Sequence, residues 1–230
     1  MIIYGRNPIH EAIRGPRTVN RIWASKNALR EPWLAPLARI TATAEADELE
    51  RLCGSDSHQG ICADVSAFQY CTADELLSMA EPMIVALDQV QDPQNLGAIA
   101  RSAECAGVSG LVLPERRSAE VTPAVCKASA GAVEHLPIAK IRNLADFLRD
   151  AKRAGLWCYG ADQDGPNDYT AVEFSGPTVL VLGSEGRGLR PRVSSSCDAL
   201  ISIPLKGRIE SLSVSAAAAV LIFAATRHRQ

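Results

Sequence analysis

The chain has 230 residues, 47% of them hydrophobic and 22% charged, with a formal net charge of −2. This composition indicates a globular protein of one or two domains and argues against a globally basic nucleic-acid binder. The seven cysteines are widely spaced without a Cys-x-x-Cys pair, so neither a disulfide framework nor a metal site is expected. The sequence shows neither a signal peptide nor an apolar segment long enough to span a bilayer, so we expect a cytoplasmic protein with no membrane partner.

Residues 1–66 are predicted to form a small α/β domain. Apolar spacing and turn residues place its helices at 8–14, 33–40 and 46–53 and its strands at 19–24 and 61–65. The domain shows no catalytic spacing, since His10 and His58 each stand alone. The cluster of basic residues that contains Arg17 is expected to be a solvated surface.

Residues 67–82 are expected to be a linker, and residues 83–230 a second domain. In the second domain, short apolar runs alternate with segments of helical spacing. The expected strands lie at 83–87, 111–113, 136–139, 156–159, 178–182 and 200–203, and the expected helices at 96–106, 122–129, 144–154 and 214–226. This alternation predicts an α/β domain with a mostly parallel sheet whose strands are buried on both faces.

Three polar segments are expected where ligands of open α/β sheets bind, beyond the carboxyl ends of the strands. In the first segment, Asn95 falls where a helix cap is expected, and Arg101 stands in an otherwise apolar helix. A guanidinium fixed in this way suits a phosphate or a developing oxyanion. The second segment places three glycines around Glu185. The third, residues 201–219, carries a proline, a glycine and then three serines in the loop after its strand, and it continues into an alanine-rich helix.

Glycine lets the backbone approach a ligand closely, so the second and third segments suit a small ligand held by backbone groups. The simpler interpretation is two tight turns and a helix cap. The run Gly183-Ser184-Glu185-Gly186-Arg187-Gly188 matches neither the dinucleotide motif Gly-x-Gly-x-x-Gly nor a P-loop, and its carboxylate would repel phosphates. A Rossmann-type dinucleotide enzyme is therefore disfavoured.

With these segments in order, the sequence resembles the SpoU, or TrmH-like, RNA ribose 2′-O-methyltransferases of the SPOUT superfamily. The motifs that carry the resemblance are Asp92-Pro93-Gln94-Asn95-Leu96-Gly97-Ala98 with Arg101-Ser102-Ala103, then Leu182 to Gly188, then Ile203-Pro204-Leu205 through Ser211-Leu212-Ser213-Val214-Ser215. The Ile-Tyr-Gly start and the His58-Gln59-Gly60 strand are similar to the family's small substrate-binding domain, which is like a ribosomal RNA-binding protein. The chain is most similar to the RlmB-like branch, which methylates a guanosine ribose in 23S ribosomal RNA.

The resemblance implies a deep C-terminal trefoil knot, S-adenosyl-methionine bound in bent form, and a homodimer with the site near the subunit interface. It gives the chemistry to Arg101, which Asn95 and Glu185 would position together with the substrate. The residues that it implies for cofactor binding are Leu182, Gly183, Gly188, Ile203, Pro204, Ser211, Leu212 and Ser215. The third motif departs from the family at Ser213, where asparagine is usual and serine lacks the amide group.

The predicted reaction is methyl transfer from S-adenosyl-methionine to a ribose 2′-hydroxyl. Because arginine stays protonated, we expect Arg101 to orient a phosphate and stabilise the forming alkoxide rather than act as a base. Three alternatives stay open: a tRNA 2′-O-methyltransferase, a ribosomal RNA methyltransferase that confers antibiotic resistance, and a non-catalytic RNA-binding member, which Ser213 would permit.

Overall fold

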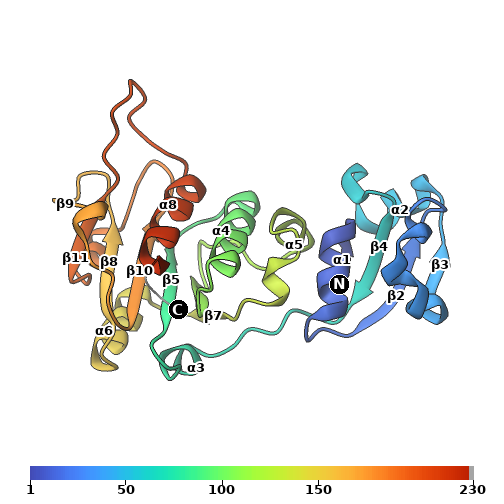
Figure 1. Cartoon of the computed structure of the whole chain (residues 1–230), viewed down its shortest axis with the longest axis horizontal. Helices are drawn as coiled ribbons and strands as arrows, with labels where there is room; N and C mark the ends of the chain where they lie inside the picture. Colours follow the sequence, from blue (N-terminus) through green and yellow to red (C-terminus); the bar gives the residue numbers. More distant parts are fainter. Residues whose placement is uncertain (228–230) are drawn as a thin grey trace.

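The computed structural model describes residues 1–227 and confirms an α/β architecture with two sheets (Figure 1). The first sheet, in the N-terminal domain, has the strand order β1-β4-β2-β3. Its strands are β1 (Ile2–Tyr4), β2 (Val19–Ala24), β3 (Thr41–Thr43) and β4 (Ile61–Val65). Alternate side chains of these strands are buried on opposite faces, against α1 (Arg6–Arg14) on one side and α2 (Ala46–Cys53) on the other.

The segment between β2 and β3 departs from the prediction in its type of helix. It forms η2 (Pro32–Ile40), a 3₁₀ helix, because Pro36 inside it cannot donate the backbone hydrogen bond that an α-helix requires. The shorter 3₁₀ turns of this domain are η1 (Ala28–Arg30) and η3 (Asp56–His58). The sequence does not predict β1 and β3, since three residues are too few to show an alternation.

The second sheet has seven strands, and every pairing between neighbouring strands is parallel, as predicted. Its order is β7-β6-β5-β10-β8-β11-β9. The strands are β5 (Met83–Asp88), β6 (Gly110–Pro114), β7 (Ile138–Ile141), β8 (Trp157–Ala161), β9 (Asn167–Asp168), β10 (Thr178–Gly183) and β11 (Ala199–Ser202). The central strands β5 and β10 are buried almost throughout, which explains their continuous apolar runs. The C-terminal trefoil knot stays a prediction, since strand order alone does not define one.

Helices cover both faces of this sheet (Figure 1). On one face lie α4 (Pro93–Cys105), α5 (Pro123–Ala128), η4 (Ala132–Glu134) and α8 (Val214–Thr226), and on the other α3 (Ala73–Leu77), α6 (Leu144–Arg153) and α7 (Pro191–Ser194). The last 3₁₀ turn is η5 (Tyr169–Ala171). Within residues 1–227, none of the helices is long and apolar enough to cross a membrane.

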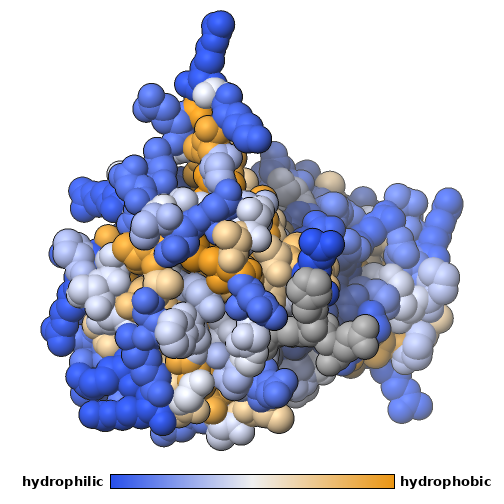
Figure 2. All heavy atoms as spheres, turned by 60° about the vertical axis from the view of Figure 1, so that its left-hand side comes forward, coloured by the Kyte–Doolittle hydropathy of each residue, from blue (hydrophilic) through white to orange (hydrophobic). Residues whose placement is uncertain are grey.

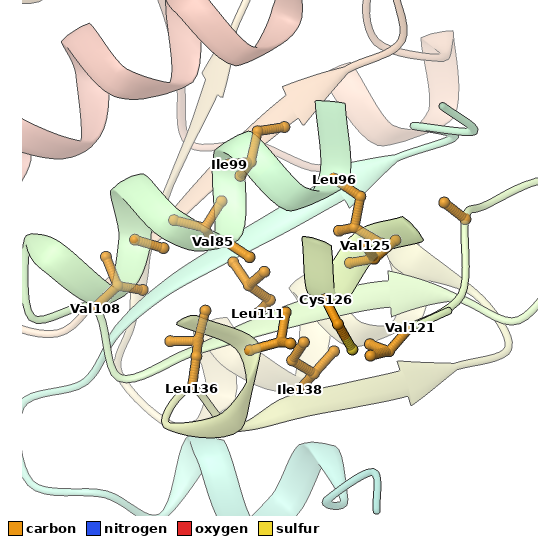
Figure 3. Packing of buried hydrophobic residues seen from close by; sticks show 14 of the residues in the cluster. Val85, Leu96, Ile99, Val108, Leu111, Val121, Val125, Cys126, Leu136 and Ile138 are labelled. Atoms are coloured by element: carbon orange, nitrogen blue, oxygen red, sulfur yellow. The ribbon is translucent and has the colours of Figure 1, made fainter. Parts of the chain in front are cut away.

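The first of these layers packs tightly around α4. Figure 3 shows Leu96 and Ile99 of α4 among the buried side chains of β5, β6 and α5. A Cβ atom on Gly97 would lie 2.4 Å from the Cβ of Ala128, so glycine allows α4 and α5 to touch. This packing fixes the direction of α4, whose first turn enters the candidate site.

The segment between the two sheets is anchored to the second one. Cys71 forms an isolated parallel bridge with Ala139 of β7, and the Leu76 side chain of α3 is fully buried beneath the sheet. The division into residues 1–66, 67–82 and 83–230 stays a prediction.

A buried ion pair joins the N-terminal domain to the second domain. Arg17 donates to Glu134 Oε1 at 2.9 Å and, at 3.0 and 2.7 Å, to the carbonyl oxygen of Ser66. Both side chains are buried, with 3% and 0% of their surface exposed. Burial raises the pKa of Glu134, although the Arg17 charge opposes this shift. The expectation of a solvated surface is therefore wrong for Arg17.

Candidate active site

The site lies at the carboxyl edge of the parallel sheet, where the segments after β5, β10 and β11 meet. The first of these segments begins α4 at Pro93, with Asp92 as its cap, because the Asp92 side chain accepts from the backbone N–H of Gln94 at 3.0 Å. The expectation that Asn95 caps this helix is wrong. Asn95 stands inside the first turn, where its amide is free to bond with other segments.

A polar network connects the three motif segments. Asn95 Nδ2 donates to Glu185 Oε1 at 3.1 Å, and Ser215 Oγ donates to Asn95 Oδ1 at 2.8 Å. The same Glu185 oxygen accepts from the backbone N–H of Val214 at 3.3 Å. These contacts bring together residues 90 and 120 positions apart in the chain, so the segments are more than separate turns. The Asn95 amide suits this position because it donates to the carboxylate and accepts from the hydroxyl at once.

Ser213 caps α8. Its hydroxyl accepts from the backbone N–H of Ala216 at 3.2 Å and lies 3.2 Å from Ser215 Oγ. Serine and asparagine are equally good helix caps. The departure from the family motif therefore keeps a cap at this position.

The glycine loop is a closed turn that holds Glu185 near its tip. Ser184 and Gly188 exchange backbone hydrogen bonds of 3.2 and 3.0 Å, and Gly186 and Gly188 have φ of 74° and 62°. A Cβ on Gly183 would lie 2.2 Å from the carbonyl carbon of Gly188. Gly183, Gly186 and Gly188 thus have a conformational role in the turn itself.

Sequence reasoning missed Asp88, which joins β5 to the segment after the glycine loop. Asp88 is buried, with 1% of the residue exposed. Its carboxylate accepts from the Arg190 backbone N–H at 2.9 Å and from Arg190 Nε at 2.8 Å. Arg190 Nη2 lies 2.7 Å from the same carboxylate. A lone carboxylate at the end of a buried apolar strand was the signal for this pairing, since such a charge requires a partner.

The third segment forms a loop that projects from the body of the domain between β11 and α8 (Figure 1). Figure 2 shows this projection with hydrophilic residues at its tip and hydrophobic ones below. Leu205, Ile209 and Leu212 are 38%, 77% and 44% exposed. The backbone of residues 203–212 makes no hydrogen bond with any residue of the described chain. The loop thus presents backbone donors, acceptors and apolar side chains to a ligand, whereas its Ser211 lies outside the polar network.

Arg101 lies apart from this network. Its side chain is exposed on α4 and makes no hydrogen bond or ion pair with another of residues 1–227. Six positions along an α-helix turn the side chain by about 120° from Asn95. A single chain thus brings Asn95, Glu185 and Ser215 together, but not Arg101.

Two families match this chain, one over each domain. The family described as RNA 2′-O ribose methyltransferase substrate binding matches residues 2–71, and the SpoU rRNA Methylase family matches residues 82–223. Together with the parallel sheet and its polar edge, these matches define an RNA methyltransferase. The chain belongs to the SpoU rRNA methylase family.

Individual relatives agree with this assignment over the full chain. A Bacillus subtilis protein whose name places it in the TrmH family of tRNA/rRNA methyltransferases is 35% identical, covering 99% of this chain and 95% of its own length. The SpoU methyltransferase AviRb from Streptomyces viridochromogenes, in complex with AdoMet, superposes with a TM-score of 0.85 at 25% identity, covering 100% of this chain and 90% of its own. An AdoMet-bound rRNA methyltransferase from Sinorhizobium meliloti gives 0.84 at 26% identity, with 100% and 87% covered.

Proposed function

We propose that the protein transfers a methyl group from S-adenosyl-methionine to the ribose 2′-hydroxyl of one guanosine in 23S ribosomal RNA. The observation that supports this most directly is the network of Asn95, Glu185 and Ser215, because it links all three motif segments at the edge where α/β domains bind ligands. The small N-terminal domain, which matches a family of RNA substrate-binding domains, adds the means to hold an RNA.

The cofactor is S-adenosyl-methionine, whose sulfonium makes its methyl group electrophilic. The residues that would hold it are Leu182, Gly183, Gly188, Ile203, Pro204, Ser211, Leu212 and Ser215. The donor set fits, because residues 203–212 have unpaired backbone groups for the polar edges of the cofactor. The exposed Leu212 side chain offers an apolar surface for its adenine ring.

The chain's own contribution is to align the 2′-hydroxyl and to assist loss of its proton. Asn95 and Glu185 position the third segment and the substrate ribose. Arg101 stays protonated, so it stabilises the oxyanion that forms and orients a neighbouring phosphate. Its exposure and its lack of a partner within residues 1–227 keep the guanidinium available for RNA.

We also propose a homodimer with the site near the subunit interface. Val220 and Phe223 on α8 are 38% and 51% exposed, and the same helix begins at the site, where the backbone N–H of Val214 donates to Glu185 Oε1. Burial of such side chains by a second copy would remove apolar surface from water. Sedimentation equilibrium tests this. Phe223→Asp should shift a dimer to monomer, and a monomeric wild type would contradict the proposal.

The decisive test of the chemistry is Arg101→Ala. Transfer of tritiated methyl groups to RNA should fall by at least about 100-fold, the scale for loss of one oxyanion-stabilising donor. Binding of S-adenosyl-methionine, measured by calorimetry, should persist. Arg149→Ala, on the far face of the sheet, is the matched control. Retained transfer in Arg101→Ala would remove this residue from the chemistry.

The RNA target is tested by mapping 2′-O-methylation on total RNA from cells with and without the gene. Loss of one guanosine methylation in 23S RNA is expected. Loss at a tRNA site instead would replace the ribosomal assignment with a tRNA methyltransferase. Calorimetry without any binding of S-adenosyl-methionine would favour a non-catalytic RNA-binding protein, an alternative that the preserved cap at Ser213 weakens.

A further inference from the structure

The exposed arginines of the protein differ in whether an acidic side chain neutralises them. On α6 and α7, Arg149, Arg153 and Arg192 each lie within 4.0 Å of an aspartate oxygen. Three other exposed arginines, at 116, 117 and 142, make no ion pair or hydrogen bond with any residue among 1–227. Paired surface arginines are largely neutralised, whereas unpaired ones keep their field for a ligand.

Arg116, Arg117 and Arg142 share one edge of the parallel sheet. Arg116 and Arg117 follow β6, and Arg142 follows β7. The strands are in register there, with Pro114 opposite Ile141, and the backbone N–H of Glu115 donates to the carbonyl of Ile141 at 2.8 Å. This is the same carboxyl edge that holds the candidate active site, because all these strands are parallel.

The loop after β6 is hydrogen-bonded to the segment after β5, which enters the candidate active site. The backbone N–H of Ala119 donates to the carbonyl of Val90 at 2.8 Å, and Ser118 Oγ donates to the same carbonyl at 3.4 Å. Arg117 has a φ of 57°, a left-handed conformation that an arginine rarely adopts and that costs free energy. The surrounding bonds therefore hold this loop in one shape.

Local charge favours a polyanion. Residues 114–121 and 138–143 carry four basic and two acidic side chains, in a chain whose net charge is −2. One of the acids, Glu120, is already paired with Lys140 at 2.6 Å. The other, Glu115, is exposed and makes no ion pair within the described chain. The patch thus keeps a net positive charge.

The patch lies between the active site and the N-terminal domain. In the sheet, β6 and β7 follow β5 on the side away from β10, and α1 and β1 of the N-terminal domain contact α5 and η4 beyond them (Figure 1). An RNA held by both domains would cross this edge. We propose that Arg116, Arg117 and Arg142 bind sugar-phosphate groups of the substrate RNA that flank the target nucleotide on the side of the N-terminal domain. This inference rests on the proposed function for the nature of the substrate.

The test measures the salt dependence of binding to a short fluorescein-labelled single-stranded RNA by the full chain. Each phosphate contact makes the slope of log association constant against log salt concentration more negative by about 0.7. Arg116→Gln with Arg142→Gln should therefore reduce the steepness of this slope by about 1.4 and weaken binding roughly 25-fold at about 0.1 M salt. The matched control, Arg149→Gln with Arg153→Gln, removes the same charge from α6 and should leave the slope unchanged.

Arg117→Gly separates binding from folding, because glycine adopts the positive φ of this position without strain. It should weaken RNA binding while thermal stability stays equal or rises. Methyl transfer by these variants should show a raised KM for RNA and an unchanged kcat. An unaltered slope and KM, or an equal loss in the α6 control, would overturn the proposal. If the wild type transfers no methyl group, the proposed function fails, and the binding data still decide the role of the patch.

Discussion

The domain junction and the candidate active site treat charged side chains in opposite ways. At the junction, Arg17 and Glu134 are removed from water and paired with each other. At the site, Arg101 is exposed and unpaired within the described chain, and Glu185 is exposed in a network of neutral partners. A buried charge without a partner costs several kcal/mol, so the pairing at the junction is needed for the stability of the fold. A charge that serves a ligand must stay available, and its stability cost is small because water solvates it.

The junction should show the largest effect on stability. Glu134→Leu leaves the Arg17 guanidinium buried without its carboxylate, so the free energy of unfolding should fall by about 3–5 kcal/mol. Urea unfolding followed by tryptophan fluorescence measures this. A loss below about 1 kcal/mol would show that Arg17 reaches water once its partner is gone.

The double variant Arg17→Met with Glu134→Leu is the control for this prediction. Removing both charges leaves apolar side chains of similar size, so most of the lost stability should return. The unpaired oxygen Oε2 of Glu134 disappears with the pair, which favours this recovery. A double variant as unstable as the single one would mean that packing, rather than charge, dominates the junction.

The site should show the reverse pattern, with a large effect on activity and a small one on folding. Asn95→Ala removes the donor to Glu185 and the acceptor of Ser215, so methyl transfer should fall about 10- to 100-fold, equivalent to roughly 1.4–2.7 kcal/mol. Stability should change by about 1 kcal/mol at most, because the Asn95–Glu185 bond is exposed.

Asp92→Asn is the matched control in the same turn of α4. Asparagine caps a helix as well as aspartate, so both activity and stability should be retained. If Asn95→Ala destabilised the protein as strongly as Glu134→Leu does, the contrast between junction and site would be lost.

The sequence predicts the sheet and its helices well because their signals are local. The apolar runs of β5 and β10 and the span of α8 at 214–226 follow directly from patterning. The partners of polar side chains are not local, and there the predictions weaken. The sequence reveals the partner of neither Arg17 nor Arg101: the Arg17 side chain pairs with Glu134, far along the chain, and the Arg101 side chain pairs with none of residues 1–227.

The site residues show the same limit. Asn95 and Glu185 can be chosen from motifs, but their direct hydrogen bond depends on β5 and β10 being neighbours in the sheet. The identity of the α4 cap also escapes prediction, because both Asp92 and Asn95 are good capping residues and packing selects between them. The Asp88–Arg190 pair depends on the same neighbouring strands.

Ser213 combines features of the junction and the site, because it belongs to a motif segment of the site but stabilises the fold as the cap of α8. Ser213→Ala removes the cap of α8 and should lower stability by about 1 kcal/mol, whereas Ser213→Asn should retain it. Thermal unfolding of the three proteins in parallel measures the difference. Methyl transfer should follow stability in both variants. A loss of activity in Ser213→Asn would instead show that the serine hydroxyl contacts substrate or cofactor.

The smallest effect is expected at the exposed rim of the junction, where His135 Nε2 lies 2.7 Å from Glu11 Oε2. Desolvation raises the pKa of Glu11, but its hydrogen bond with His135 and the Arg14 charge lower it by more, so the folded pKa lies below the ordinary 4.5. A carboxyl with a lowered pKa stabilises the fold above its unfolded pKa and loses this contribution as pH falls through the folded value.

Glu11→Gln should therefore be less stable than the wild type at neutral pH by about 1 kcal/mol at most, because the pair is exposed. The difference should vanish once the pH falls below the lowered pKa of folded Glu11, where both proteins carry a neutral side chain. Melting temperatures across this range measure it, and a gap that stays constant with pH would mean that packing of the side chain, rather than its charge, holds the rim.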